Sequence, residues 1–254
     1  IVWQTPVDLV PPYLPGNVLH IHYGSPVITA SNTVLVPVKV NRSGGFRVEA
    51  RAGSNGALMW TTDSDYVLPP HDWVPSYNIA LTPGNRLYLP LAGGRLGYRD
   101  NADAATGTLA TVAFYGNEAY AAAAAQYNAN VIITTPLTVD ARGNVFFGYL
   151  VQGNTPQNLA NGIARVAPDG SARFVSVREA AGAANPAMTK VATNSAPALS
   201  PDLSTVYVAV VSQPPAGERP SGTLLALDAT TLATRESIAL RDPATGQLAW
   251  VSDN

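Results

Sequence analysis

PALSPDLSTVYVAVV, at residues 197–211, is the stretch of sequence that decides the fold. It contains a short apolar segment, a polar turn and a longer segment rich in β-branched and aromatic residues, which is typical of a β-hairpin. Similar strings occur at 26–38 (PVITASNTVLVPV), 79–91 (IALTPGNRLYLPL) and 136–150 (PLTVDARGNVFFGYL). Internal repetition on this scale indicates a repeat architecture.

The middle of the longer segment is Leu35, Tyr88, Phe146 and Tyr207 in the four copies, at intervals of 53, 58 and 61 residues. Each interval has room for about four short strands, which predicts an all-β protein, a β-propeller with about four four-stranded blades. We expect one β-propeller domain over residues 1–254, with blades at 24–62, 78–115, 132–178 and 195–240, and residues 1–7 as an outer strand of a neighbouring blade.

A propeller closes because each blade buries one face against the next, and an open array leaves apolar faces bare. Four blades rarely close into a ring alone, since typical propellers have ~4–8 blades. We therefore expect an incomplete propeller, or one whose last residues complete the sheet of the first blade. A β-sandwich is the alternative fold. It explains the strand content but not the ordered repeat. The alanine-rich run NEAYAAAAAQY at 117–127 predicts one short helix in an inter-blade loop.

The composition excludes several classes of function. The net charge of −2 provides no basic stripe, so nucleic acid is not an expected partner. The absence of cysteine excludes disulfides, thiolate metal sites and a cysteine nucleophile. No apolar run approaches ~18 residues, so no transmembrane segment is expected. The charged fraction of only 13% and the start at IVWQTP favour a processed or truncated chain that is periplasmic or secreted.

Two strings carry a resemblance to a known family. GTLLALDATTL at 222–232 and GALMW at 56–60 resemble the recurring strand, Asp, small-residue turn and Trp of the quinoprotein-like (pyrroloquinoline-quinone-type) β-propeller superfamily. The resemblance implies a propeller architecture over most of the chain. A quinone cofactor is not supported by motif, because the second and third blades lack the family's Trp and the chain has no vicinal cysteines.

Candidate site residues fall in the long connections between blades, at 8–24, 63–77, 116–131 and 179–194. Long loops on a rigid scaffold are where function concentrates. His20 and His22 share one face of a strand at i, i+2 spacing, and His71 lies in PPHDW. If adjacent blades bring the three imidazoles together, they form a divalent metal site with an open position. The alternative is that these histidines cap or stack within their loops.

The first two connections also contain an aromatic cluster with a neighbouring carboxylate: Tyr13, Tyr23, Tyr66, Trp73, Tyr77 and Asp72. Aromatic rings in proline-rich loops suit a sugar or peptide platform, although they also pack loops onto blade edges. Asp63, Asp65 and Asp72 are an alternative set of calcium ligands, without EF-hand spacing. Arg178, Glu179 and Lys190 lie near the connection between the third and fourth blades, but no pattern selects them.

These observations favour an extracytoplasmic binding or interaction module that uses its long inter-blade loops as the binding face. Its expected partner is a small molecule, a glycan or a protein, and an open blade edge would favour a homo-oligomer. The alternative is a propeller enzyme, an oxidoreductase or hydrolase, with the histidines at the channel mouth. A third reading is a partial domain without independent activity.

Overall fold

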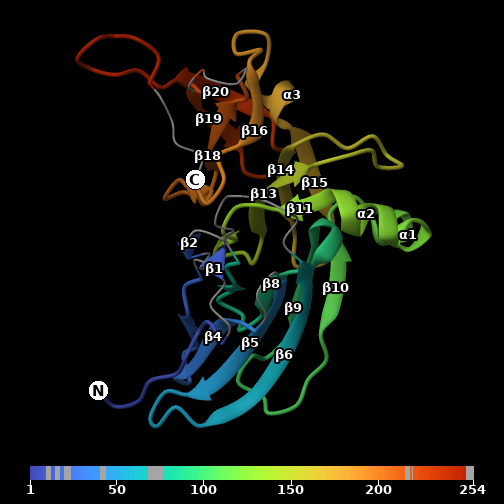
Figure 1. The fold of residues 1–254 in the computed structure, drawn as a ribbon, viewed down its shortest axis with the longest axis vertical. Coiled ribbons are helices and arrows are strands. Elements are labelled where there is room, and N and C mark those ends of the chain that lie inside the picture. The colour runs from blue at the N-terminus through green and yellow to red at the C-terminus, as the bar shows by residue number, and fades with distance from the viewer. Residues whose placement is uncertain are drawn as a thin grey trace.

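The computed structural model describes residues 1–9, 13–14, 18–19, 24–40, 44–67, 77–214, 218 and 220–249. Four antiparallel sheets follow one another along an arc, from the first blade at the lower end of Figure 1 to the fourth at the upper end. The predicted all-β propeller of four-stranded blades is confirmed. The sheets are not stacked as two layers, so the chain is not a β-sandwich.

The strands of the first two blades are β3 (Val27–Ile28), β4 (Thr33–Lys39), β5 (Gly44–Ala52) and β6 (Leu58–Val67), then β7 (Ala80–Leu81), β8 (Leu87–Pro90), β9 (Arg95–Arg99) and β10 (Ala110–Ala113). Those of the third are β11 (Val131–Ile133), β12 (Thr138–Val139), β13 (Val145–Val151), β14 (Gly162–Val166) and β15 (Ala172–Ser176). Those of the fourth are β16 (Met188–Val191), β17 (Ala198–Leu199), β18 (Thr205–Ser212), β19 (Gly222–Asp228) and β20 (Thr234–Ala239). A separate hairpin pairs β1 (Tyr13–Leu14) with β2 (Val18–Leu19).

The innermost strand of the third and fourth blades is interrupted. Both β11 and β12 pair with β13, and both β16 and β17 pair with β18. Pro136 and Pro197 lie in the two interruptions, where a residue without an N–H cannot extend the ladder. In the third blade the gap is filled by Thr135, whose hydroxyl accepts a 2.8 Å hydrogen bond from the Gly148 N–H.

The sequence repeat corresponds to a repeat in strand register. Leu35, Tyr88, Phe146 and Tyr207 each pair with the first residue of the short inner strand of their own blade. The first three are almost completely buried, whereas Tyr207 is 38% exposed. Phe146 packs with residues of the fourth blade, while the corresponding face of the fourth blade has no further sheet against it among the described residues.

The turn after each inner strand is built in the same way. A Thr, Asp or Ser side chain accepts a hydrogen bond from the N–H at the start of the next strand, over 2.8–3.1 Å. These acceptors are Thr29, Thr82, Asp140 and Ser200. Three residues later comes a residue with positive φ: Asn32 (64°), Asn85 (62°), Gly143 (85°) and Leu203 (58°). Gly and Asn tolerate this conformation, so the polar turns of the sequence encode the hairpins directly.

The core lies between the blades. One apolar cluster joins the first three blades, and a second joins the third and fourth. Phe146 belongs to the second cluster and Phe147 to the first, because successive side chains of β13 point to opposite faces of the sheet. The third sheet therefore packs against its neighbours through both faces, as blade stacking requires.

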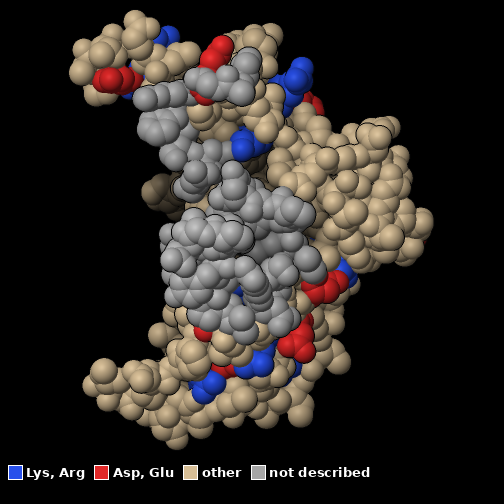
Figure 2. Space-filling model, viewed as in Figure 1, with Lys and Arg blue, Asp and Glu red and all other residues tan. Residues whose placement is uncertain are grey.

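The predicted helix at 117–127 is present as two short helices, α1 (Asn117–Ala122) and α2 (Ala124–Asn130), which project from the side of the arc in Figure 1. Ala123 separates them with φ −148° and ψ 41°. On the face shown in Figure 2, this projection presents no Lys, Arg, Asp or Glu side chain. Two further elements were not predicted: the 3-10 turn η1 (Ala92–Gly94) and α3 (Val177–Ala181).

Residues 1–7 contain no strand and lie against the first blade. Val7 and Leu9 hydrogen-bond through their backbones to Lys39 of β4, over 2.8 and 2.9 Å. The Trp3 indole N–H donates a 2.9 Å hydrogen bond to the Gly53 carbonyl at the turn between β5 and β6. The segment is thus a strap on blade one. No helix among the described residues combines the length and the apolar character that crossing a membrane requires.

Candidate functional site

Most of the predicted site residues lie outside the described residues: His20, His22, Tyr23, His71, Asp72 and Trp73. The three-histidine metal site therefore stays a prediction. Within the described part of the chain, no group of three or more His, Asp or Glu side chains is arranged to hold a metal ion.

Tyr66 and Tyr77 are buried in the core. The Phe46 ring stacks on Tyr77 with centroids 4.2 Å apart and meets Tyr66 edge-on at 5.8 Å. The Tyr66 hydroxyl donates a 2.7 Å hydrogen bond to the Ile133 carbonyl, which ties the end of β6 to the third blade. Burial raises the pKa of both phenols. With exposures of 1% and 0%, these two rings hold blades together and present little surface to a ligand.

Asp65, one of the alternative calcium ligands, is engaged in contacts within the protein. Its carboxylate forms an ion pair with Arg95 and accepts a 2.9 Å hydrogen bond from the Ala92 N–H. The Arg95 guanidinium also lies 4.2 Å from the centroid of the Tyr120 ring. This set of contacts fixes η1 and α1 to the end of β6.

A groove lies at the end of the third and fourth blades where the connections between blades gather; we call this end the loop face. It consists of two adjoining cavities, of about 480 and about 800 Å³, which share Thr189 and Gln213. The smaller cavity adjoins the third blade and is lined by Val151, Gln152, Gly153, Asn154, Leu159, Ala160, Asn161 and Arg178 besides the shared pair. The larger adjoins the fourth and includes Ser212, Ser221, Glu218, Asp242, Thr245 and Gln247.

The wall formed by the β13–β14 connection is held in place by amide side chains. The Asn161 side chain accepts a 2.8 Å hydrogen bond from the Val151 N–H and donates a 3.0 Å bond to the Thr189 carbonyl. Asn130, the last residue of α2, donates to the Asn154 carbonyl over 3.2 Å. Because both contacts join elements far apart in sequence, the groove is preorganised by the packing of α2 and β16 around the loop.

Helix α3 positions the cation of the groove. Ser176 caps this helix by accepting a 3.1 Å hydrogen bond from the Glu179 N–H. Val177, Ala180 and Ala181 are buried against the second core cluster, so the other face of the short helix is exposed. Arg178 lies on that face and lines the smaller cavity. No carboxylate of the described residues pairs with its guanidinium.

The chemistry of the groove changes along its length. The third-blade half holds Arg178 and neutral amides, while the fourth-blade half holds hydroxyls and the carboxylates of Glu218 and Asp242. Between them, the Thr189 hydroxyl donates a 3.3 Å hydrogen bond to Gln213 Oε1. Arg178 lies beside the connection between the third and fourth blades, but no sequence pattern selected it. Gln152, Asn154 and Gln213 carried no sequence signal, because amides in loops are common.

A further cavity of about 590 Å³ lies at the opposite end of the blades, among the turns that follow the first three inner strands. Its most conspicuous charged group, Asp103, accepts hydrogen bonds from Thr29 (2.5 Å) and Asn85 (2.7 Å). Burial raises the pKa of Asp103, but these hydrogen bonds outweigh burial and leave it below its usual value. Asp103 thus braces the first blade against the second, and the loop-face groove is the better candidate for a site.

No protein-family model matches the chain, and no curated protein matches it by sequence. Among solved structures, a europium-containing methanol dehydrogenase is similar with a TM-score of 0.53 and 13% identity, covering 85% of this chain and 42% of that one. The chain resembles a quinoprotein-like β-propeller in architecture. It spans less than half of that dehydrogenase chain, and at this identity the likeness concerns the fold alone.

Two weaker likenesses are to the Dos1 propeller and to a protein from Lactobacillus plantarum. The first has a TM-score of 0.44 at 12% identity and covers 81% of this chain and 43% of that one. The second has a TM-score of 0.41 at 13% identity and covers 92% and 54%, respectively. With TM-scores below 0.5, neither contributes to the argument on function.

Proposed function

We propose that this chain is an extracytoplasmic β-propeller module that binds its ligand in the loop-face groove. The observation that carries the proposal is the groove itself, a concave surface that is polar in its third-blade half and whose walls are fixed by hydrogen bonds between distant elements. A binding surface that is already in place avoids the entropic cost of ordering loops on association. Polar groups on a rigid scaffold are the usual basis of specific recognition.

The low charged fraction supports the extracytoplasmic location. The measurement that checks this location is fractionation of the source cells followed by detection with an antibody against the protein. Recovery in the cytoplasmic fraction alone would contradict this part of the proposal without affecting the groove.

The binding role is tested by screening immobilised oligosaccharides and peptides with wild-type protein and a groove-blocked variant, Thr189→Trp. The matched control is Thr230→Trp, which places the same ring in the exposed turn after β19, at the opposite end of that strand from the groove. We expect ligands that bind the wild type and the control but not the blocked variant. Absence of any such ligand would overturn the proposal.

The metal content of the purified protein distinguishes the enzyme alternative from the binding module. It is measured by elemental mass spectrometry for the wild type and for the His71→Ala variant. Stoichiometric metal that is lost in this variant would move the function from the groove to a histidine site. Metal-free protein in both samples would remove the three-histidine site from consideration.

A further inference from the structure

We propose that the ligand of the groove is an acidic oligosaccharide, whose carboxylate is bound by Arg178 and whose hydroxyls are bound by the neighbouring amides. This inference rests on the proposed function and names the class of ligand. Three features support it: the exposed guanidinium of Arg178, which has no ion-pair partner among the described residues, the neutral polar lining around it, and the negative charge at the far end of the groove.

Arg178 is a cation whose backbone is fixed and whose side chain is available. Its neighbour Val177 is fully buried, and the Val177 N–H donates a 2.8 Å hydrogen bond to the Asn161 carbonyl. Gly182 closes the helix by donating to the Arg178 carbonyl over 3.2 Å. The described residues hold no ion-pair partner for the guanidinium. A planar guanidinium with free N–H groups binds carboxylates in a two-point geometry, which is stronger than a single contact.

The lining beside Arg178 is suited to hydroxyl groups. The exposed amide side chains of Gln152, Asn154 and Gln213 each offer both donors and an acceptor, as hydroxyls do. Gln213 Oε1 accepts from Thr189, which orients the amide and leaves its NH₂ group to donate. Vicinal sugar hydroxyls present alternating donors and acceptors of this kind.

The lining around Arg178 does not favour a peptide, although the larger cavity also has apolar members, among them Pro214, Pro220 and Leu248. Peptide recognition relies on apolar pockets that bury large anchoring side chains. The smaller cavity has only Val151, Leu159 and Ala160 as apolar members, and the first two are themselves half-buried in the protein. An oligosaccharide needs no such pocket, because most of its surface is hydroxylated.

The far half of the groove sets the direction in which the oligosaccharide binds. Glu218 and Asp242 line the larger cavity, and the Asp242 carboxylate already accepts a 2.8 Å hydrogen bond from the Ala244 N–H. Two carboxylates repel a second acidic sugar and accept hydrogen bonds from neutral hydroxyls. The acidic residue of the ligand therefore lies at the Arg178 end, and neutral sugar residues extend past Thr189 and Gln213.

The test compares an aldotriouronic acid, in which one uronic acid residue is joined to two neutral sugar residues, with its methyl ester, because the two differ only in the one free carboxylate. Dissociation constants are measured by isothermal titration calorimetry for the wild type, Arg178→Gln, Arg178→Lys and the control Arg173→Gln. Arg173 is an exposed arginine of β15 that does not line the groove. Thermal melting of each variant establishes that it is folded.

We expect the wild type and Arg173→Gln to bind the acid about tenfold more tightly than the ester. Arg178→Gln should remove this preference, and Arg178→Lys should retain part of it, since lysine keeps the charge but not the two-point geometry. The preference should also weaken between 50 and 500 mM NaCl.

Equal affinity for acid and ester, or a preference that survives in Arg178→Gln, would overturn the inference. So would failure of both oligomers to bind. In that case a different ligand that Thr189→Trp displaces would leave the proposed function standing, whereas the absence of any groove ligand would overturn both.

Discussion

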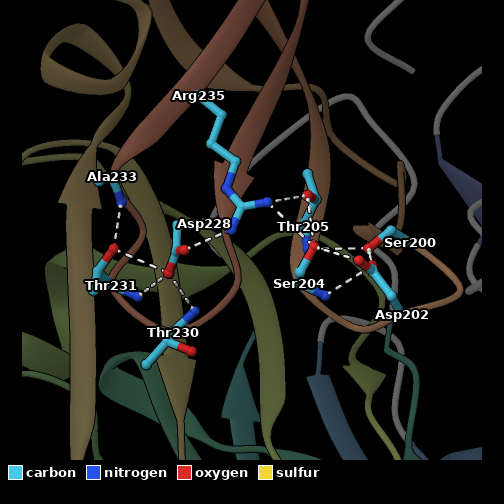
Figure 3. Close-up of polar contacts among 9 residues, drawn as sticks. All are labelled: Ser200, Asp202, Ser204, Thr205, Asp228, Thr230, Thr231, Ala233 and Arg235. Atoms are coloured by element: carbon cyan, nitrogen blue, oxygen red, sulfur yellow. Dashed lines mark hydrogen bonds and ion pairs between the residues drawn. The ribbon is translucent and has the colours of Figure 1, made fainter.

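The guanidinium of Arg235 donates a 2.8 Å hydrogen bond to the carboxylate of Asp228, which lies at the turn after β19 of the fourth blade (Figure 3). Its other terminal nitrogen donates to the hydroxyls of Thr205 (2.8 Å) and Ser204 (3.2 Å). One side chain on β20 thereby connects the turn after β19 with the turn before β18.

Replacing Arg235 with Gln should weaken the fourth blade by about 1 kcal/mol, because the pair is partly exposed to solvent and exposed pairs contribute little more. For a chain of this size that corresponds to a fall of roughly 2–4 °C in the melting temperature. Differential scanning calorimetry measures the change. Arg173→Gln is the control, and an equal loss in both variants would contradict the role of the bridge.

Stability should fall in acid through the carboxylates of these turns. Hydrogen bonds from the Ser200 hydroxyl and the Ser204 N–H lower the pKa of Asp202 to about 2, and those from the Thr231 N–H and Arg235 lower the pKa of Asp228. Because both folded-state pKa values lie below the unfolded value of about 3.9, the stabilisation is complete above that value and is lost as the pH falls toward 2.

The check is the urea midpoint at pH 5.0, 3.5 and 2.5 for the wild type and for the double variant Asp202→Asn, Asp228→Asn. The wild type should lose more stability than the variant on acidification. Parallel curves would show that these two carboxylates do not contribute.

Glu49→Gln should be strongly destabilising. The Glu49 carboxylate is 3% exposed and forms ion pairs with both Arg47 and Arg51 on the same strand. Burial raises the pKa of Glu49, but the hydrogen bonds from Arg51 and Arg47 outweigh it and leave the pKa below its usual value. Removing one partner of a buried pair costs on the order of 3 kcal/mol. Chemical denaturation measures this loss, and Glu236→Gln, at an exposed position of β20, should change little.

Trp3 and Gly56 should be energetically coupled. A Cβ added to Gly56 would lie 2.7 Å from the Trp3 ring, and Gly56 also has a φ of +72°. Gly56→Ala therefore has two costs, a steric one that involves Trp3 and a backbone one of about 1 kcal/mol that does not. In the Trp3→Ala background only the backbone cost should remain.

A double-mutant cycle on the free energy of unfolding measures this coupling. Additive effects of the two substitutions would show that the N-terminal strap does not rest on this turn in solution.

Leu203→Asn should stabilise the protein. Leu203 occupies the left-handed position that Asn32, Asn85 and Gly143 occupy in the other blades. A branched side chain is disfavoured there by about 1 kcal/mol, and Asn relieves much of this strain. We expect a gain of about 0.5 kcal/mol by thermal melting. Leu203→Ala keeps a Cβ without the local hydrogen bonding of Asn, so a similar gain in that variant would contradict the explanation.

The sequence contained enough information to predict the blades but not the N-terminal segment. Hairpins follow from local patterns, and the four turns carry their own capping side chains and left-handed residues. Residues 1–7 resemble a strand in composition, yet in the structure Trp3 meets the turn near Gly53. That contact links residues 50 positions apart, which no local pattern records. Helix α3 was missed because five residues are too few to show helical periodicity.

By itself, the sequence determined the repeat, the all-β class and the end of the blades at which long connections gather, because each depends on residues close together in the chain. Tertiary structure alone decided which of those residues share a surface. It buried Tyr66 and Tyr77 in the core and paired Asp65 with Arg95. It also brought Arg178 beside Gln213 in one groove. The physical reason is that blade stacking brings distant loops together, and the energy of stacking resides in buried side chains rather than in the loops themselves.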